Sequence, residues 1–272
     1  MPLDRYHKTR FTRWTDPAVA KPVARDVFQL VRPAAPAVIV LHELFGLSKS
    51  AVALGDHLAD HEPPFSVYLP VLFGRPEAGP FSNAVRAFCV RRQFEFFRTG
   101  RTSPITSWLR FLAQHASGES GGKTVGLIGM CLTGGLVFAA VAEPLVGAGV
   151  ASQPSLPMGL LGRLSPQRVK RDLGLSPADL ATSVAGNTPM MKLRYRNDRI
   201  CPEARIETAA AAFGGVGEYQ TDDIDDRVQA ATGDRMTVVQ IAGAKHSVLT
   251  QDLNERARDL VVEFLRSHLG SD

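Results

Sequence analysis

The strongest constraint on the fold is an alternation of short apolar runs with amphipathic stretches. Runs rich in β-branched residues are typical of buried strands, and they lie at Ala37–Leu41, Phe65–Leu69, Thr124–Gly129, Val146–Val150, Met190–Tyr195 and Met236–Ile241. Helical patterns are found between or after them, at Ser48–His61, Asn83–Arg98, Pro104–Ala116, Leu132–Ala142, Pro202–Phe213 and Gln251–His268. This order predicts an α/β fold, with a mostly parallel central sheet and helices on both faces. In such sheets the reacting groups lie on loops at the carboxyl ends of the strands.

The chain has no internal repeat and no low-complexity linker, so we expect its 272 residues to form one domain, 1–272. The segment Gly159–Gly186 is the least regular part, and we expect loops and short helices there. The pattern leaves open whether this segment is a lid. It also leaves the oligomeric state open.

Composition excludes several classes of protein. No window approaches the roughly 18 uninterrupted apolar residues of a membrane span, and the N-terminus lacks the apolar run of a secretory signal, so we expect a cytoplasmic protein that does not bind membranes. The net charge is +4, but basic residues are interleaved with acids along the chain. Nucleic-acid binding is therefore not expected, whereas the positive balance could suit a small anionic substrate. Three cysteines without a CxxC pair predict neither disulfides nor a metal site, and we expect no cofactor.

The segment Gly129-Met-Cys-Leu-Thr-Gly-Gly135 lies where an apolar run meets a helical pattern. A tight strand-to-helix turn of this kind lifts one side chain above the sheet as a nucleophile. Cys131 occupies that position, where the amides of the following helix favour a thiolate. The amide of Leu132 would be an oxyanion donor. Thr133 departs from the usual pattern, which has a glycine there, and the alternative interpretation is a buried structural cysteine.

A nucleophilic thiol needs a histidine, and the histidine needs a carboxylate to orient it. His246 follows the last predicted strand, and Asp198 follows the predicted strand Met190–Tyr195. The chain order of nucleophile, acid and histidine is that of α/β-hydrolases. We therefore predict a Cys131–His246–Asp198 triad.

With these residues in place, the chain resembles the dienelactone hydrolase family, which has the α/β-hydrolase fold. The resemblance rests on Leu41-His-Glu-Leu-Phe-Gly46, Tyr68-Leu-Pro-Val-Leu-Phe-Gly-Arg75, Gly129-Met-Cys-Leu132, Asn197-Asp198 and His246-Ser247. It implies that Glu43 interacts with the resting thiol and is displaced by substrate. It also implies a second oxyanion donor at the amide of Leu44 and a substrate carboxylate bound by Arg75. The family's second carboxylate-binding arginine has no counterpart in Ser247–Thr250.

Together these features predict hydrolysis of a small ester or lactone through a thioester acyl-enzyme, without metal or cofactor. A thioesterase or general carboxylesterase using the same site is the first alternative. The second is a non-catalytic member of the fold that binds a ligand. The segment Ser152–Pro157 follows a strand at the catalytic edge and is expected to form a wall of the pocket.

Overall fold

A computed structural model describes residues 3–13, 23–43, 46–74, 76, 104–155, 171–173 and 175–269. The expected helix at Asn83–Arg98, and most of the irregular segment that begins at Gly159, lie outside these ranges. None of the helices in the described ranges combines the length and the apolar character needed to cross a bilayer.

The described strands form one ten-stranded sheet in the order β1-β2-β4-β3-β5-β6-β7-β10-β9-β8. Their bounds are β1 His7–Arg13, β2 Val23–Leu30, β3 Ala37–Leu41, β4 Ser66–Pro70, β5 Val125–Met130, β6 Val146–Ser152, β7 Met190–Tyr195, β8 Gln220–Thr221, β9 Val228–Thr232 and β10 Met236–Ile241. The strands from β4 to β10 in this order pair in parallel, and these are the strands that the apolar runs predict. The prediction of a mostly parallel sheet is confirmed.

The antiparallel strands at the two edges are absent from our prediction. β1 pairs along its whole length with β2 at one edge, and β9 and β8 extend the other. Edge strands carry polar side chains and so lack a continuous apolar run. In β1, Lys8 and Arg10 each form an ion pair of 2.8 Å with Asp26 of β2. These are contacts across strands, which a pattern along one strand does not display.

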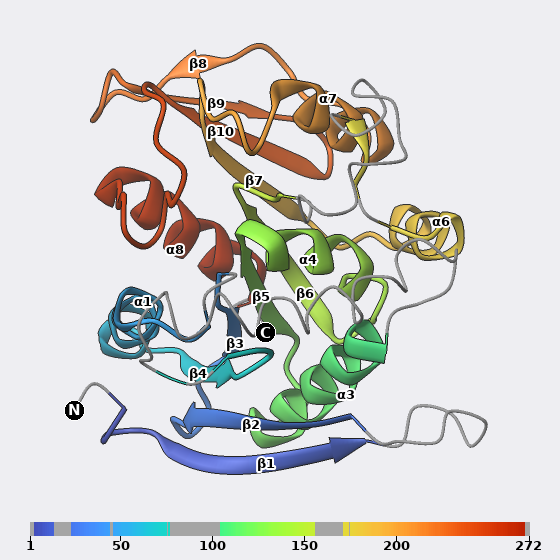
Figure 1. Ribbon diagram of the computed structural model, residues 1–272, viewed down its shortest axis with the longest axis vertical. Helices are drawn as coiled ribbons and strands as arrows, with labels where there is room; N and C mark the ends of the chain where they lie inside the picture. The colour runs from blue at the N-terminus through green and yellow to red at the C-terminus, as the bar shows by residue number, and fades with distance from the viewer. Residues whose placement is uncertain are drawn as a thin grey trace.

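The helices cover both faces of the sheet. Their bounds are α1 Lys49–Asp60, α3 Pro104–Glu119, α4 Gly134–Ala140, α6 Pro177–Ala185, α7 Glu203–Ala212 and α8 Glu255–Leu269, with a short 3₁₀ helix, η2, at Cys131–Thr133. Figure 1 shows α1 and α8 on one side of the sheet and α3, α4, α6 and α7 on the other. The helix expected at Leu132–Ala142 is thus divided into η2 and α4, and the expected Gln251–His268 begins only at Glu255.

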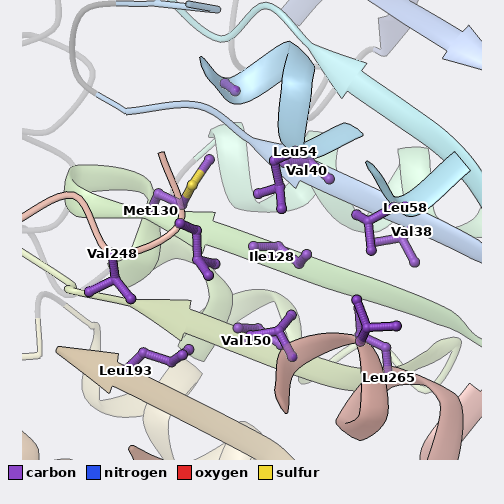
Figure 2. Close-up of a cluster of buried hydrophobic side chains, with 14 of the residues drawn as sticks. Val38, Val40, Leu54, Leu58, Ile128, Met130, Val150, Leu193, Val248 and Leu265 are labelled. Carbon is purple, nitrogen blue, oxygen red and sulfur yellow. The ribbon is translucent and has the colours of Figure 1, made fainter. Parts of the chain in front are cut away.

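Each face of the sheet has its own hydrophobic core, one with α1 and α8 and the other with α3, α4 and α7. Because the central strands are buried on both faces, their sequences read as continuous apolar runs. Figure 2 shows Met130 and Val248 in the first core, beside Ile128 and Leu193. Met130 directly precedes Cys131, and Val248 lies two residues after His246. The core therefore anchors both loops that carry these residues.

Candidate active site

The strand order places the predicted residues along one edge of the sheet. Glu43 follows β3, Cys131 follows β5, Asp198 follows β7 and His246 follows β10. These strands are parallel neighbours, with β6 between β5 and β7. Their carboxyl ends therefore point to the same side. Leu44 and Arg75, which the resemblance adds to the site, lie outside the described residues.

Cys131 lies at a sharp turn between β5 and η2, and its φ of 55° is in the left-handed region. Such a conformation is disfavoured for a residue with a side chain and is typical of functional turns. A Cβ at Gly129 would lie 2.5 Å from the carbonyl oxygen of Thr133, so only glycine fits there. Leu132 is the second residue of η2, and its amide belongs to the first turn, where N–H groups are free of helical bonds.

Thr133 replaces the glycine usual at this turn, and its hydroxyl is used inside the protein. Oγ1 accepts a hydrogen bond of 3.0 Å from the amide of Met130. It also lies 3.1 Å from the carbonyl oxygen of His42 and 2.9 Å from that of Met130, either of which can accept its proton. The side chain therefore connects the nucleophile turn to the loop that carries Glu43.

His246 and Asp198 are brought into direct contact. Nδ1 of His246 donates to Oδ2 of Asp198 over 2.6 Å. The other carboxylate oxygen, Oδ1, accepts from the amides of Ile200 at 2.8 Å and Cys201 at 3.2 Å. Burial opposes the charge on Asp198, but the bonds to His246 and to the two amides outweigh it and lower the pKa of the carboxyl. Asp198 is therefore a buried, oriented carboxylate.

The imidazole of His246 favours its charged form. Burial lowers the pKa of the ring, but the hydrogen bond to Asp198 and the interactions with Cys131 outweigh burial and raise the pKa to about 10. Nε2 of His246 is buried and has no well-aligned hydrogen bond within the described part of the chain. The raised pKa of the ring nevertheless includes a contribution from Cys131. A positive ring beside a thiol favours the thiolate.

Sγ of Cys131 makes its hydrogen bond with Ser155, on the loop after β6, where Sγ and Oγ are 3.1 Å apart. The amide of Ser155 also donates to the carbonyl oxygen of Cys131 over 2.9 Å. The carboxylate of Glu43 lies against Gln153, whose Nε2 donates to Oε1 of Glu43 at 2.9 Å. Gln153 is fully buried, with a φ of 34°, and its Oε1 accepts from the hydroxyl of Ser152.

Several residues at this edge are absent from our predicted site. Asp252 accepts from the amides of His246 at 3.2 Å and Ser247 at 3.1 Å and so holds the histidine loop. The buried ring of His42 bonds the carbonyl oxygen of Glu43 and the amide of Leu72, and burial lowers its pKa to about 4. In the sequence, Ser155 was indicated only by its place in Ser152–Pro157, the segment predicted to form a wall of the pocket. His42 and Asp252 carry no signal of their own, because both act on the main chain of other loops.

The chain is similar to known proteins in sequence and in fold. The family model described as "Dienelactone hydrolase family" matches residues 27–213, a range that contains Cys131 and Asp198 and ends before His246. The structure resembles that of dienelactone hydrolase from Anabaena variabilis, with a TM-score of 0.60, 13% identity, and coverage of 97% of this chain and 99% of that one. It also resembles acetyl xylan esterase from Aspergillus awamori, with a TM-score of 0.59, 10% identity, and coverage of 95% and 98%.

At such identities the two structures show the shared fold. No curated protein matches the chain significantly in sequence. The family model, in contrast, covers more than half of the chain. This chain therefore belongs to the dienelactone hydrolase family and has its α/β-hydrolase fold.

Proposed function

We propose that this protein hydrolyses a small carboxylic ester or lactone, with Cys131 as nucleophile, His246 as proton carrier and Asp198 as the acid that orients the ring. One observation carries the proposal. The Asp198 carboxylate holds Nδ1 of His246 at 2.6 Å, while Cys131, at a strained turn, raises the pKa of the same ring. Family membership supports the class of reaction.

The reaction would begin with attack of the Cys131 thiolate on the ester carbonyl carbon, which moves the C=O π electrons onto oxygen. The amide of Leu132 would donate to this oxyanion. The His246 imidazolium would give its proton to the departing alkoxide, leaving a thioester on Cys131. Neutral His246 would then take a proton from water, and the resulting attack would release the acid and regenerate the thiolate.

Glu43, Leu44 and Arg75 enter the proposal through the family resemblance. Leu44 would supply the second oxyanion donor, Arg75 would bind a substrate carboxylate, and Glu43 would be displaced as substrate enters. With no arginine in Ser247–Thr250, only half of the family's acid recognition is present. Uncharged esters are therefore substrates to test beside dienelactone, and acetyl xylan esterase is a structural neighbour. A thioesterase using the same site is tested with them.

The test is turnover of a dienelactone, p-nitrophenyl acetate and an acyl thioester by the wild type and three variants. Cys131→Ala should abolish turnover of the preferred substrate while the thermal melt is retained. Cys131→Ser replaces the thiol with a hydroxyl, a weaker nucleophile, and should retain a small fraction of the activity. Cys201→Ala, which removes a buried thiol, is the matched control and should stay active. Turnover that survives Cys131→Ala would contradict the proposal, and no turnover on any substrate would favour the ligand-binding alternative.

A further inference from the structure

Ser155 contacts the proposed nucleophile at two points. Its hydroxyl oxygen is 3.1 Å from Sγ of Cys131, and its amide donates to the Cys131 carbonyl oxygen over 2.9 Å. The two contacts come from the main chain and the side chain of a single residue. Ser155 is therefore tied to the nucleophile turn itself, and its hydroxyl is held against the sulfur.

The loop that carries Ser155 is immobilised by buried contacts on both sides. The amide of Gln153 donates to the carbonyl oxygen of Leu193 in β7 over 2.7 Å. Nη1 of the buried Arg205 donates to the carbonyl oxygen of Pro154 at 3.1 Å. A Cβ at Gly134 would lie 3.0 Å from Cα of Pro154, so the loop packs directly on the start of α4. Ser155 is itself only 5% exposed, which makes its position a property of the fold.

Among the described residues, the well-aligned hydrogen bond of the sulfur is the one to Ser155, and the Glu43 carboxylate is bonded elsewhere. His246, on the loop after β10, is the proton carrier of the proposed reaction and would take the proton of the Cys131 thiol. Glu43, on the loop after β3, has a carboxylate oxygen bonded to Nε2 of Gln153. Either Sγ or the hydroxyl oxygen could donate in this 3.1 Å contact, but a thiolate can only accept, so the hydroxyl would be the donor whenever the sulfur is ionised. Hydrogen bonds to charged groups are among the stronger ones in proteins.

We propose that Ser155 is a further catalytic residue, whose hydroxyl donates a hydrogen bond to the Cys131 thiolate. This bond keeps the sulfur in position between one catalytic cycle and the next. The hydroxyl keeps its proton throughout, so the bond adds no proton-transfer step. The bond would stabilise the thiolate in the free enzyme and would return when the thioester is hydrolysed. This inference rests on the proposed function, because it requires Cys131 to be the nucleophile.

The test is the rate of Cys131 alkylation by iodoacetamide as a function of pH, followed by mass spectrometry of the Cys131 peptide. Loss of a hydrogen bond to a charged group weakens the charged form by about tenfold or more, which corresponds to about one pH unit. Ser155→Ala should therefore move the alkylation midpoint to higher pH by about one unit and lower kcat/KM about tenfold, mainly through kcat. Ser155→Thr keeps the hydroxyl and should restore the midpoint.

The matched control is Ser120→Ala, which removes a buried serine hydroxyl at the end of α3 and should leave the profile unchanged. If Ser155→Ala does not fold, Ser155→Gly removes the same hydroxyl and takes its place. A profile that stays at the wild-type midpoint, or moves to lower pH, would overturn the role of Ser155. Alkylation is measured without turnover, so this result is distinct from failure of the proposed function, which is recognised by activity that survives Cys131→Ala.

Discussion

At the scale of single residues, the side chain that departs most from the usual nucleophile turn has its own structural role. Thr133 is fully buried, and its hydroxyl accepts from the amide of Met130 and lies near the carbonyl oxygens of Met130 and His42. A glycine there would leave this amide without that bond. The departure therefore strengthens the connection between the nucleophile turn and the Glu43 loop.

We predict that Thr133→Val destabilises the protein, because the valine has the shape of threonine but leaves the Met130 amide buried without its partner. Leaving a buried donor unpaired costs about 1–3 kcal/mol of unfolding free energy. Urea unfolding measures this change. Thr133→Ser keeps the hydroxyl and should retain most of the stability. Equal stability of the valine variant and the wild type would contradict this role for the hydroxyl.

At the scale of elements, the strand-to-helix turn depends on close approach of main chain to main chain. Gly129 ends the pairing of β3 with β5 and lies against the carbonyl group of Thr133. At Gly135, the second residue of α4, an added Cβ would meet its nearest neighbour, the carbonyl oxygen of Leu173, at an ordinary contact distance of 3.6 Å. The two glycines of the motif therefore differ: a Cβ would clash at Gly129, which must be glycine, whereas a Cβ would fit at Gly135.

We predict opposite effects for alanine at these two positions. Gly129→Ala places a Cβ 2.5 Å from a main-chain oxygen, so the turn must shift, and overpacking of this kind costs about 1–3 kcal/mol or more. Gly135→Ala should be neutral or raise the unfolding free energy by up to about 1 kcal/mol, because alanine favours the helix. Thermal and urea unfolding of both variants check this pair. A Gly129→Ala protein as stable as Gly135→Ala would show that the turn has room to adjust.

At the scale of the whole molecule, a buried charge makes stability depend on pH. Lys192 of β7 is fully buried, and its Nζ donates to the carbonyl oxygen of Arg205 over 2.9 Å. Burial is the main cause that lowers its pKa to about 7, and the positive charges of Arg205 and Arg194 act in the same direction, against an opposing contribution from Cys201. In the unfolded chain the lysine titrates near its ordinary value of about 10.4.

Between about pH 7 and pH 10 the unfolded chain therefore binds more protons at Lys192 than the folded protein does. On account of this group, the unfolding free energy should rise with pH across this window. As the pH falls back through the window the gain is lost, and below about pH 7 the group contributes no further change. We predict that Lys192→Met reduces this rise, because methionine does not titrate. Urea unfolding at pH 7, 8 and 9 measures the slope. Lys49→Met, at an exposed position of α1, is the control and should keep the wild-type slope.

The sequence by itself determined the class of fold and the loops that carry the candidate site. Each parallel strand is an apolar run because it is buried on both faces, and each helix has its own periodicity, so both are local signals. Cys131, Asp198 and His246 could be nominated because each follows such a strand, and family membership confirms an α/β-hydrolase of an ester-hydrolysing family. Their catalytic roles stay predictions. The polar edge strands β1 and β8, which lack an apolar run, could not be recognised in this way.

Only the tertiary structure decided which polar groups meet. The strand order β3-β5-β6-β7-β10 sets the loop after β6 beside the nucleophile turn, and the contact of Ser155 with Cys131 follows from it. Gln153 reaches Glu43 across 110 positions of the chain, and Thr133 reaches the carbonyl oxygen of His42 across 91. A hydrogen bond depends on the distance between two atoms, and no pattern along a single segment encodes the distance to a segment elsewhere in the chain.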